Sequence, residues 1–570
     1  MRATRCTFPI FPQNIGSRLL IAAGTMLRVT PIYGSHLDER GPSNTSRCTL
    51  IEYGGVSVLW NVGWTDTLPK LPDHQALILS DSTLGSMGGL PLYYQKFPST
   101  PTFATFPTVK MGQMALYDQH ASLCLDGTKP PFSLEELDSA TVALHTIKYS
   151  QTVTIPDPIT GVPALSITAQ RAGHVVGGAF FVLQRLVDET IVVLTSTYHV
   201  ARELHLDSST LLKYGATPDV LVAYPGGPAM GQLSQLYGGS TKPLIQQPVV
   251  SQAEKTLTET VLAVLRRDGN VLLPVDASGR VLELLLLLSQ HWDRHRLGGA
   301  YNLCWLGSMT KNTADFARSQ LEWMAAPLGA QFDSQRGHPY ALKNVSICCS
   351  MSELETAIAN GNPSCVVASG ASLDCGMARD LLLKWADNQD HAVVFTDSSR
   401  CHLRTNSPDT GAEIADDDLV GSRLSQEDVS DFSTAGQLLS HWCQAKLEGR
   451  EMDDVVDVDV PVPHRAPLAG AELKTFMAQE EAARLAKKDA EEKQAMLREV
   501  ELAKGQLRLG EEEEKNKPKM AVPTRFPASR PKKKSRFDSS LFIKFSKPLH
   551  REYCLFLKAL LLITDSQFRL

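Results

Sequence analysis

The stretch that decides the fold is ALILSDSTLGSMGGLP, residues 76–91. Its beginning is apolar, as in a buried strand, and it leads into a loop that is rich in glycine at residues 85–89. A second loop of this kind, AGHVVGG at residues 172–178, lies between two further apolar runs. Strands that run into glycine-rich loops are typical of an α/β fold in which such loops carry the polar groups of a site.

Outward from these loops, residues 49–194 consist of short apolar runs separated by turns. The runs are rich in valine, isoleucine, threonine and aromatic residues, which pack well on a pleated, half-buried surface. One helix is predicted over residues 133–148, where Ser133 and Glu136 have the spacing of a capping box. We predict strands at residues 49–51, 56–60, 76–79, 102–106, 165–169, 179–183 and 191–194.

From residue 219 the pattern changes to strands that alternate with helices. Such alternation implies a parallel sheet covered by helices, so the sequence predicts two α/β units in tandem with a boundary near residue 215. Strands are predicted at residues 220–223, 271–275, 301–305, 365–368 and 392–395. Helices are predicted at residues 252–267, 280–292, 313–324 and 377–385.

The composition is that of an ordinary globular protein, because 43% of the 570 residues are hydrophobic and 21% are charged. This excludes a wholly disordered chain and a collagen-like chain. The 56 Lys and Arg against 62 Asp and Glu give a net charge of −6, which excludes a globally basic nucleic-acid binder. The longest apolar run, within residues 281–288, is too short to span a bilayer, so no membrane partner is expected. The 11 cysteines include no CxxC pair and fit free thiols in a reducing compartment.

Both ends of the chain differ from the middle. Residues 1–25 contain arginines but no acidic residue, and fit an N-terminal extension or a transit peptide. Residues 401–468 are expected to be an acidic return segment and linker, since they are acidic and end in several prolines. Residues 469–516 are dense in charges of both signs, which predicts one long solvated helix. Residues 517–570 start with lysines and arginines and predict a basic, largely disordered tail.

The two glycine-rich loops suggest the frame of a metallohydrolase. A hydrolase with two zinc ions needs imidazole and carboxylate groups that converge from such loops, so that the ions can hold a phosphodiester and activate water. The question is therefore whether the loops of this chain supply those ligands.

Several short stretches carry a resemblance to a known family. They occur in order over roughly residues 26–455 and lie at residues 109–118, 148–151, 172–178, 202–206, 267–272, 275–284, 319–324, 373–381 and 446–449. Together they resemble the metallo-β-lactamase/β-CASP family of RNA-processing proteins. The resemblance implies a metallo-β-lactamase-like αββα sandwich at residues 26–215, followed by a β-CASP α/β domain at residues 216–400.

Active members of this family carry an HxHxDH motif and further histidine and aspartate ligands. The corresponding positions here are Asn61, Asp81, Thr83, Gly85, Ser86, His174 and Thr197, of which His174 alone retains the family's residue. Hydroxyl and amide oxygens bind zinc poorly, and Asp81 with His174 falls short of the three protein ligands that a single zinc ion normally needs. We therefore predict no metal, no cofactor and no catalytic residue, and expect an inactive nuclease fold.

Within the family, the resemblance is to the inactive member of the cleavage and polyadenylation specificity factor. It implies a non-catalytic scaffold in the nucleus that takes part in pre-mRNA 3′-end cleavage and polyadenylation. The implied partners are the active β-CASP nuclease subunit, the large scaffold and polyadenylation-signal-recognition subunits, a symplekin-like scaffold and the pre-mRNA. Two alternatives stay open. One is the inactive β-CASP subunit of the Integrator complex. The other is a metal-dependent RNA hydrolase with atypical ligands, which would need His199 or His205, although both are expected to be surface or hydrogen-bonded histidines.

The basic tail contains candidate contacts. Phe526, Pro527, Phe537 and Asp538 resemble a short family peptide that docks on the polyadenylation-signal module, and apolar anchors in a disordered strip suit folding upon binding. Residues 541–570 resemble nothing in the family, which suggests a truncated or mis-spliced product or a shortened subunit. Candidate nuclear-import or RNA contacts are Lys532, Lys533, Lys534 and Arg536, together with Arg280 at a predicted helix start.

Overall fold

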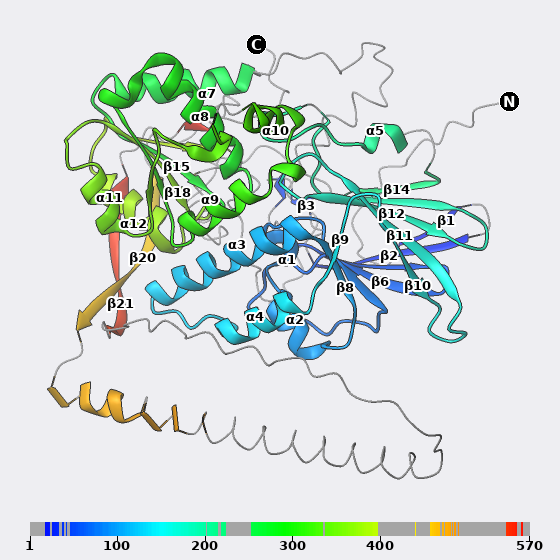
Figure 1. The fold of residues 1–570 in the computed structure, drawn as a ribbon. Helices are drawn as coiled ribbons and strands as arrows, with labels where there is room; N and C mark the ends of the chain where they lie inside the picture. Colours follow the sequence, from blue (N-terminus) through cyan, green and yellow to red (C-terminus); the bar gives the residue numbers. More distant parts are fainter. Residues whose placement is uncertain are drawn as a thin grey trace, which may run out of the picture. The chain divides into compact units, whose positions relative to one another are not determined.

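The structure is a computed structural model that describes residues 46–200, 202–214, 218–223, 252–334 and 337–396, together with shorter pieces outside these ranges. The chain divides into two units, Met1–Pro461 with His550–Leu570, and Val462–Leu549. Within the first unit we call the described residues up to 223 the first lobe and residues 252–396 the second lobe. The two lobes are coloured blue to cyan and green in Figure 1.

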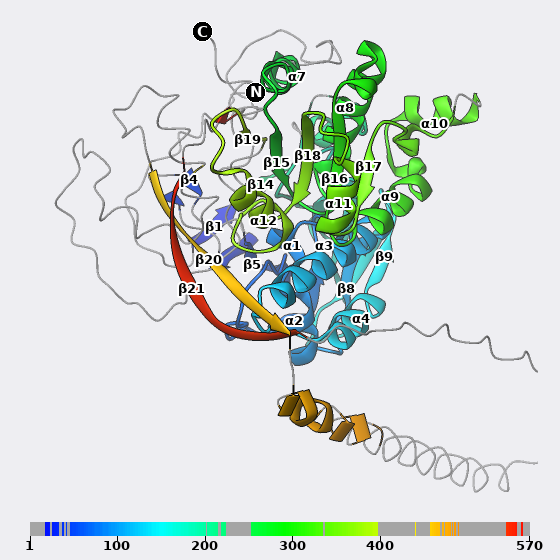
Figure 2. The ribbon, with the colours of Figure 1, turned by 90° about the vertical axis from the view of Figure 1, so that its left-hand side faces the viewer.

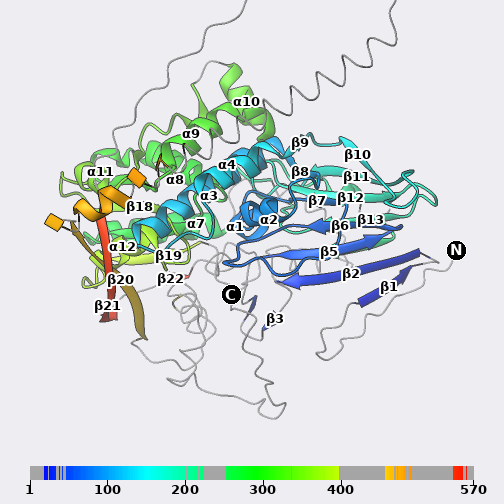
Figure 3. The same ribbon diagram turned by 90° about the horizontal axis from the view of Figure 1, so that it is seen from below.

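The first lobe contains two sheets, whose strands Figure 3 shows in two adjacent layers. The seven-stranded sheet has the order β1 (Arg18–Ala22), β2 (Thr25–Tyr33), β5 (Cys48–Tyr53), β6 (Val56–Trp60), β7 (Ala76–Ile78), β8 (Thr102–Thr105) and β9 (His145–Ile147). The five-stranded sheet has the order β10 (Thr152–Pro156), β11 (Pro163–Arg171), β12 (Ala179–Arg185), β13 (Ile191–Thr195) and β14 (Val220–Ala223). Because β14 pairs with β13, this sheet extends past the expected boundary near residue 215.

Alternating side chains build the layers of the first lobe. In β12, Phe181 and Leu183 pack in the core between the two sheets, while Phe180 and Val182 pack on the outer face against Tyr198. On the free face of the seven-stranded sheet, a further core joins the strands to four helices. These are α1 (Leu84–Met87), α2 (Leu90–Lys96), α3 (Phe106–Leu125) and α4 (Leu134–Val142). The layered arrangement confirms the predicted metallo-β-lactamase-like sandwich.

The second lobe is a parallel sheet with helices on both faces, as predicted (Figure 2). The strand order is β17 (Ser346–Cys348), β16 (Asn302–Leu306), β18 (Ser364–Ser369), β15 (Val271–Val275), β19 (Ala392–Phe395) and β22 (Leu560–Leu561). One face packs against α7 (Gln252–Leu265), α8 (Val281–His295) and α9 (Thr310–Ser319). The other packs against α11 (Met351–Ala357) and α12 (Gly376–Trp385). The short helices α5 (Leu211–Tyr214) in the first lobe and α10 (Ala326–Asp333) in the second complete the lobes.

Two predicted helices are wrong in extent. The predicted helix over residues 133–148 ends with α4 at Val142, and residues 145–147 instead form β9, which pairs with β8 at the sheet edge. The predicted helix over residues 313–324 is α9, which begins earlier and ends at Ser319. Gln320 has φ −113° and ψ 25°, which breaks the helix before a single 3₁₀ turn. In both cases the apolar spacing continues beyond the residues that are helical.

The remaining described pieces lie mostly toward the ends of the chain. Strands β20 (Val456–Pro467) and β21 (Ile543–Leu555) pair with each other, and a short pair is formed by β3 (Leu37–Asp38) and β4 (Gly41–Pro42). Within the predicted charged helix, described helical residues occur between residues 470 and 488. The described cysteines all carry free thiols. None of the described helices is both long and apolar enough to cross a bilayer.

Candidate functional site

Asp81 lies just beyond the end of β7 and is completely buried. Its Oδ1 accepts hydrogen bonds from the Thr83 backbone N–H at 3.0 Å and the Thr83 hydroxyl at 2.5 Å. Its Oδ2 accepts from the Thr197 hydroxyl at 2.8 Å and from the Ser196 hydroxyl at 3.4 Å. The structure thus brings three of the predicted positions together, namely Asp81, Thr83 and Thr197. They form a single carboxylate surrounded by hydrogen-bond donors.

The environment of Asp81 keeps its carboxylate ionised. Burial by itself would raise the pKa of Asp81. The positive charge of Arg47 and the hydrogen bonds from Thr83 and Thr197 act in the opposite direction, and the net result is a pKa below the usual value for aspartate. Arg47 is not among the residues singled out from the sequence, and only packing brings its charge to bear on Asp81.

Asn61 and Ser86 are also buried at this loop end. The Asn61 Oδ1 accepts a hydrogen bond from the Ser80 backbone N–H at 2.8 Å, which anchors the end of β7. Asn61 has φ +61°, a left-handed conformation that asparagine tolerates better than most residues. Within the described part of the chain, neither the Asn61 Nδ2 nor the Ser86 Oγ has a hydrogen-bond partner. Both groups can donate a hydrogen bond, and neither can supply the negative charge that a metal ligand of this family provides.

Gly85 takes part in this site through its backbone. It lies in α1, and its carbonyl oxygen accepts a hydrogen bond from the Arg47 backbone N–H at 2.9 Å. A Cβ on Gly63 would lie 2.3 Å from the same carbonyl, so the two segments can approach this closely only with glycine at position 63. The position of the family's aspartate is therefore used for close packing.

His174 is the one family ligand that is retained, and it is buried in the loop after β11. The centre of its ring lies 6.4 Å from that of His199. Two glycines shape its loop. Gly173 has φ +78°, and Gly177 has φ +77° while its carbonyl accepts from the Thr105 hydroxyl at 2.6 Å. The loop is thus held in place by backbone contacts.

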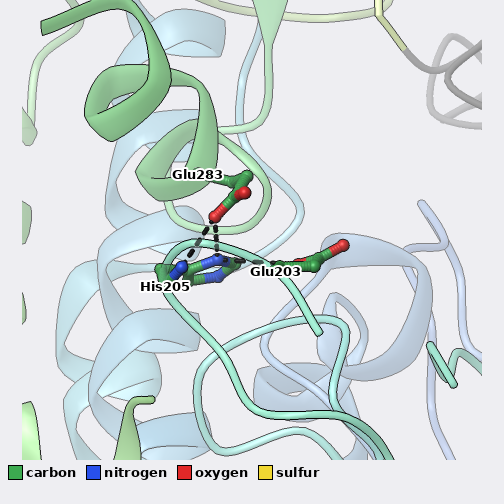
Figure 4. A group of neighbouring side chains, drawn as sticks. All are labelled: Glu203, His205 and Glu283. Atoms are coloured by element: carbon green, nitrogen blue, oxygen red, sulfur yellow. Dashed lines mark hydrogen bonds and ion pairs between the residues drawn. The ribbon is translucent and has the colours of Figure 1, made fainter. Parts of the chain in front are cut away.

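A second buried polar cluster contains Glu203, His205 and Glu283 (Figure 4). Glu283 accepts from the His205 Nδ1 at 2.6 Å, and from the backbone N–H groups of Leu204 and His205 at 2.9 Å each. Glu203 forms an ion pair with Arg280. His205 is hydrogen-bonded, as expected, but no sequence pattern pointed to its partner Glu283, which lies in the other lobe.

The charge of Glu283 is stabilised by these contacts. Burial alone would raise its pKa, but the His205 ring, Arg280 and the Leu204 N–H lower the pKa of Glu283 to about 2. One ligand atom from each of Glu203, His205 and Glu283 lies within 4.8 Å of the others, a spacing at which a metal ion can be held. Both Glu283 oxygens accept from N–H groups of the protein and the Glu203 Oε1 pairs with Arg280, whereas within the described residues the Glu203 Oε2 and the His205 Nε2 have no hydrogen-bond partner.

The family's zinc ions do not fit the residues at the end of β7. A pair of zinc ions requires several anionic or imidazole ligands with free lone pairs. Here the one carboxylate accepts four hydrogen bonds and lies near a guanidinium group, and the neighbouring positions offer hydroxyls and an amide N–H₂. A carboxylate that is held by protein donors, beside hydroxyl and amide groups, fits a polar core better than a metal centre.

The other candidate contacts differ in how far the structure describes them. Arg280 is the residue before α8. Its guanidinium, a candidate for contact with RNA, forms an ion pair with Glu203. The tail positions lie outside the described residues; they are Phe526, Pro527, Lys532, Lys533, Lys534, Arg536, Phe537 and Asp538.

Comparison with known proteins agrees with the resemblance. Residues 50–224 match the metallo-beta-lactamase superfamily domain, and residues 281–401 match the Beta-Casp domain. The chain is 31% identical over 411 residues to a "Probable cleavage and polyadenylation specificity factor subunit 2" of Drosophila melanogaster, an overlap of 70% of this chain and 50% of that protein. It is 29% identical over 387 residues to the "Cleavage and polyadenylation specificity factor subunit 2" of Arabidopsis thaliana, which is 66% of this chain and 48% of that protein.

A similar overlap exists with a protein that is named as an enzyme. The chain is 24% identical over 413 residues to "Endoribonuclease YSH1" of Saccharomyces cerevisiae, covering 68% of this chain and 49% of that protein. The chain therefore spans about half the length of the curated relatives that it matches. The first match covers most of the first lobe, and the second match covers the second lobe from α8 onward.

Proposed function

Because the chain belongs to the metallo-β-lactamase/β-CASP family, we propose that it is a non-catalytic scaffold subunit of a nuclear complex that cleaves and polyadenylates pre-mRNA. The model for this role is the factor named in the relatives from Drosophila and Arabidopsis. In this role the protein holds an active β-CASP nuclease subunit in place and does not cut RNA itself.

One observation carries the proposal: at the positions of the family's metal ligands, the Asp81 carboxylate is already occupied by hydrogen bonds from neighbouring hydroxyl and N–H groups. The Asp81 carboxylate accepts from Thr83, Thr197 and Ser196 and lies in the field of Arg47. To bind zinc, it would have to give up these bonds and tolerate two positive groups close together. Without zinc, the fold has no means of activating water for phosphodiester cleavage in the manner of its family.

The partners follow from the same assignment. A scaffold subunit of this complex pairs with the active β-CASP nuclease and contacts the large scaffold subunit, the polyadenylation-signal-recognition subunits and a symplekin-like protein. The pre-mRNA is then the substrate of the assembly. Residues Lys532, Lys533, Lys534 and Arg536 serve nuclear import or contact RNA phosphates, since a run of such charges suits either purpose.

The test is a measurement of metal content and RNA cleavage on the purified full chain. After dialysis against a zinc-containing buffer and removal of free ions, we expect well below one zinc per chain and no cleavage of a polyadenylation-signal RNA. A variant that restores the family frame (D81H/T83H/G85D/S86H with T197D) is the positive control, because it adds the imidazole and carboxylate ligands that zinc prefers.

A different outcome would support the hydrolase. Tightly held zinc in the natural chain, together with RNA cleavage that is lost in His174→Asn, would overturn the scaffold proposal. The overlap with an endoribonuclease makes this the alternative to exclude first. Co-purification with a tagged copy separates the remaining case, because Integrator subunits would replace the polyadenylation machinery among the recovered proteins.

A further inference from the structure

Buried polar contacts cross between the two lobes at three separate places. At the first, Glu283 of α8 reaches from the second lobe to residues 204–205 of the first. Both carboxylate oxygens accept backbone N–H groups of that loop, and one also accepts from the His205 ring. Glu283 and His205 are almost completely buried (3% and 0% exposed), so water cannot replace these bonds. The adjacent Arg280–Glu203 ion pair crosses the same boundary.

At the second place, the carboxylate comes from the first lobe and binds a turn of the second. Asp118 lies on α3 of the first lobe, and its carboxylate accepts from the backbone N–H of Ser308 at 2.9 Å and from the Ser308 hydroxyl at 2.6 Å. Ser308 belongs to the turn between β16 and α9 of the second lobe. Asp118 is 5% exposed. A buried carboxylate of one lobe therefore holds a turn of the other.

The third contact is a two-bonded ion pair at the end of α3. The Arg379 guanidinium on α12 donates to both oxygens of Asp126, at 2.8 and 2.7 Å. The Arg379 side chain is 2% exposed and that of Asp126 is 9% exposed. A paired, planar contact of this kind fixes orientation as well as distance.

We propose that these three contacts form an interlobe clamp, defined by Glu283, Asp118 and the Arg379–Asp126 pair, that holds both lobes as one closed body. Separation of the lobes would break several hydrogen bonds to ionised groups that are shielded from water, and bonds of this kind contribute more to stability than exposed ion pairs do. Glu283 belongs to the second lobe, and Asp118 and Asp126 belong to the first, so each lobe contributes carboxylates that bind groups of the other. A slide of one lobe along the other would therefore break all of these contacts together. The clamp does not depend on the proposed function.

The clamp gives a physical role to stretches that the site at β7 does not use. Residues 117–118, 202–206, 278–284 and 373–381 all carry part of the family resemblance, and each contributes to or adjoins one of the three contacts. Four of the nine stretches that carry the resemblance therefore lie at or beside contacts between the lobes.

The experiment is amide hydrogen exchange followed by mass spectrometry on the full chain with Glu283→Ala. We expect exchange to rise about tenfold or more at residues 203–206, at 307–309 and around 374–379, while strands such as β6 and β15 stay protected. The matched control is Glu353→Ala, which breaks the exposed Lys311–Glu353 pair inside the second lobe and should change none of these segments.

Two outcomes would overturn the clamp. One is faster exchange confined to residues 203–206, which would show that the three contacts act independently. The other is no change beyond that of the control. If Glu283→Ala unfolds the whole chain, the milder Ser308→Ala replaces it, because this change removes only the hydroxyl bond to Asp118. Faster exchange at residues 203–206 in this variant supports the clamp, and unchanged exchange there refutes it.

Discussion

At the scale of single residues, Asp81 carries a carboxylate at a position where the family frame has a histidine. In the family frame this position carries a metal ligand, whereas here the carboxylate organises the loop by accepting hydrogen bonds from Thr83 and Thr197. Its lowered pKa arises because the Arg47 charge and these donors outweigh the effect of burial. Asp81 therefore contributes to the stability of the fold only while it is ionised.

We predict that Asp81→Asn lowers the free energy of unfolding by about 2–3 kcal/mol at neutral pH, as for hydrogen bonds to a buried charged group. The amide would face several donors with an N–H₂ group of its own. Since the pKa of Asp81 is lower in the folded protein than its unfolded value of 3.8, the contribution is complete above that value and is lost as the pH falls below it. Urea denaturation from pH 7 to pH 3 measures this.

The matched control for this change is Asp315→Asn, because the Asp315 side chain is 73% exposed and pairs only with Arg318 at the surface. It should alter stability little at any pH. Equal losses in the two variants, or a loss in Asp81→Asn that does not depend on pH, would contradict the role of the ionised carboxylate.

At the scale of secondary structure, α3 is the longest of the described helices that the sequence did not predict. The helix begins at Phe106, with the Thr105 hydroxyl accepting from the Thr108 N–H as an N-cap and a proline in its first turn. It packs against α4 and β8 in its own lobe and against α9 and α12 in the other. A helix buried on opposite sides has no single apolar stripe, so the periodicity that reveals surface helices is missing.

Glycine substitutions test how tightly α3 is packed. A Cβ on Gly112 would lie 2.0 Å from the Met87 Sδ, whereas a Cβ on Gly329 in α10 would meet nothing within 4 Å. Alanine favours a helix over glycine by about 1 kcal/mol, so Gly329→Ala should stabilise the protein slightly. We predict that Gly112→Ala instead destabilises it by about 1–3 kcal/mol through overpacking. Thermal unfolding of both variants measures these changes. A shift of the unfolding temperature in the same direction in both variants would contradict the close packing at Gly112.

At the scale of the whole molecule, the proposed role depends on contacts outside the two lobes. The docking peptide inferred from the resemblance places apolar anchors at Phe526 and Phe537 in a polar, basic stretch. Such anchors supply most of the binding energy when an unstructured segment folds onto a partner.

We predict that the double variant Phe526→Ala and Phe537→Ala reduces recovery of the large scaffold subunit from nuclear extract by about tenfold, which corresponds to about 1.4 kcal/mol of binding free energy. Recovery of the active β-CASP nuclease should be less affected, since the lobes remain unchanged. Phe332→Ala, at an exposed phenylalanine of the second lobe, is the control. Quantitative pull-down measures the effect, and unchanged recovery would remove the peptide from the proposal.

The sequence by itself determined the α/β character of both lobes. Strand and helix periodicity is a local property, so the parallel sheet of the second lobe and most strands of the first could be predicted. The tertiary structure alone decided which groups surround Asp81 and what joins the lobes. Arg47 lies 34 positions from Asp81 in the chain, and Glu283 lies 78 positions from His205, so no local pattern links them. Their pairing is fixed only when packing removes water and each buried charge must find a partner.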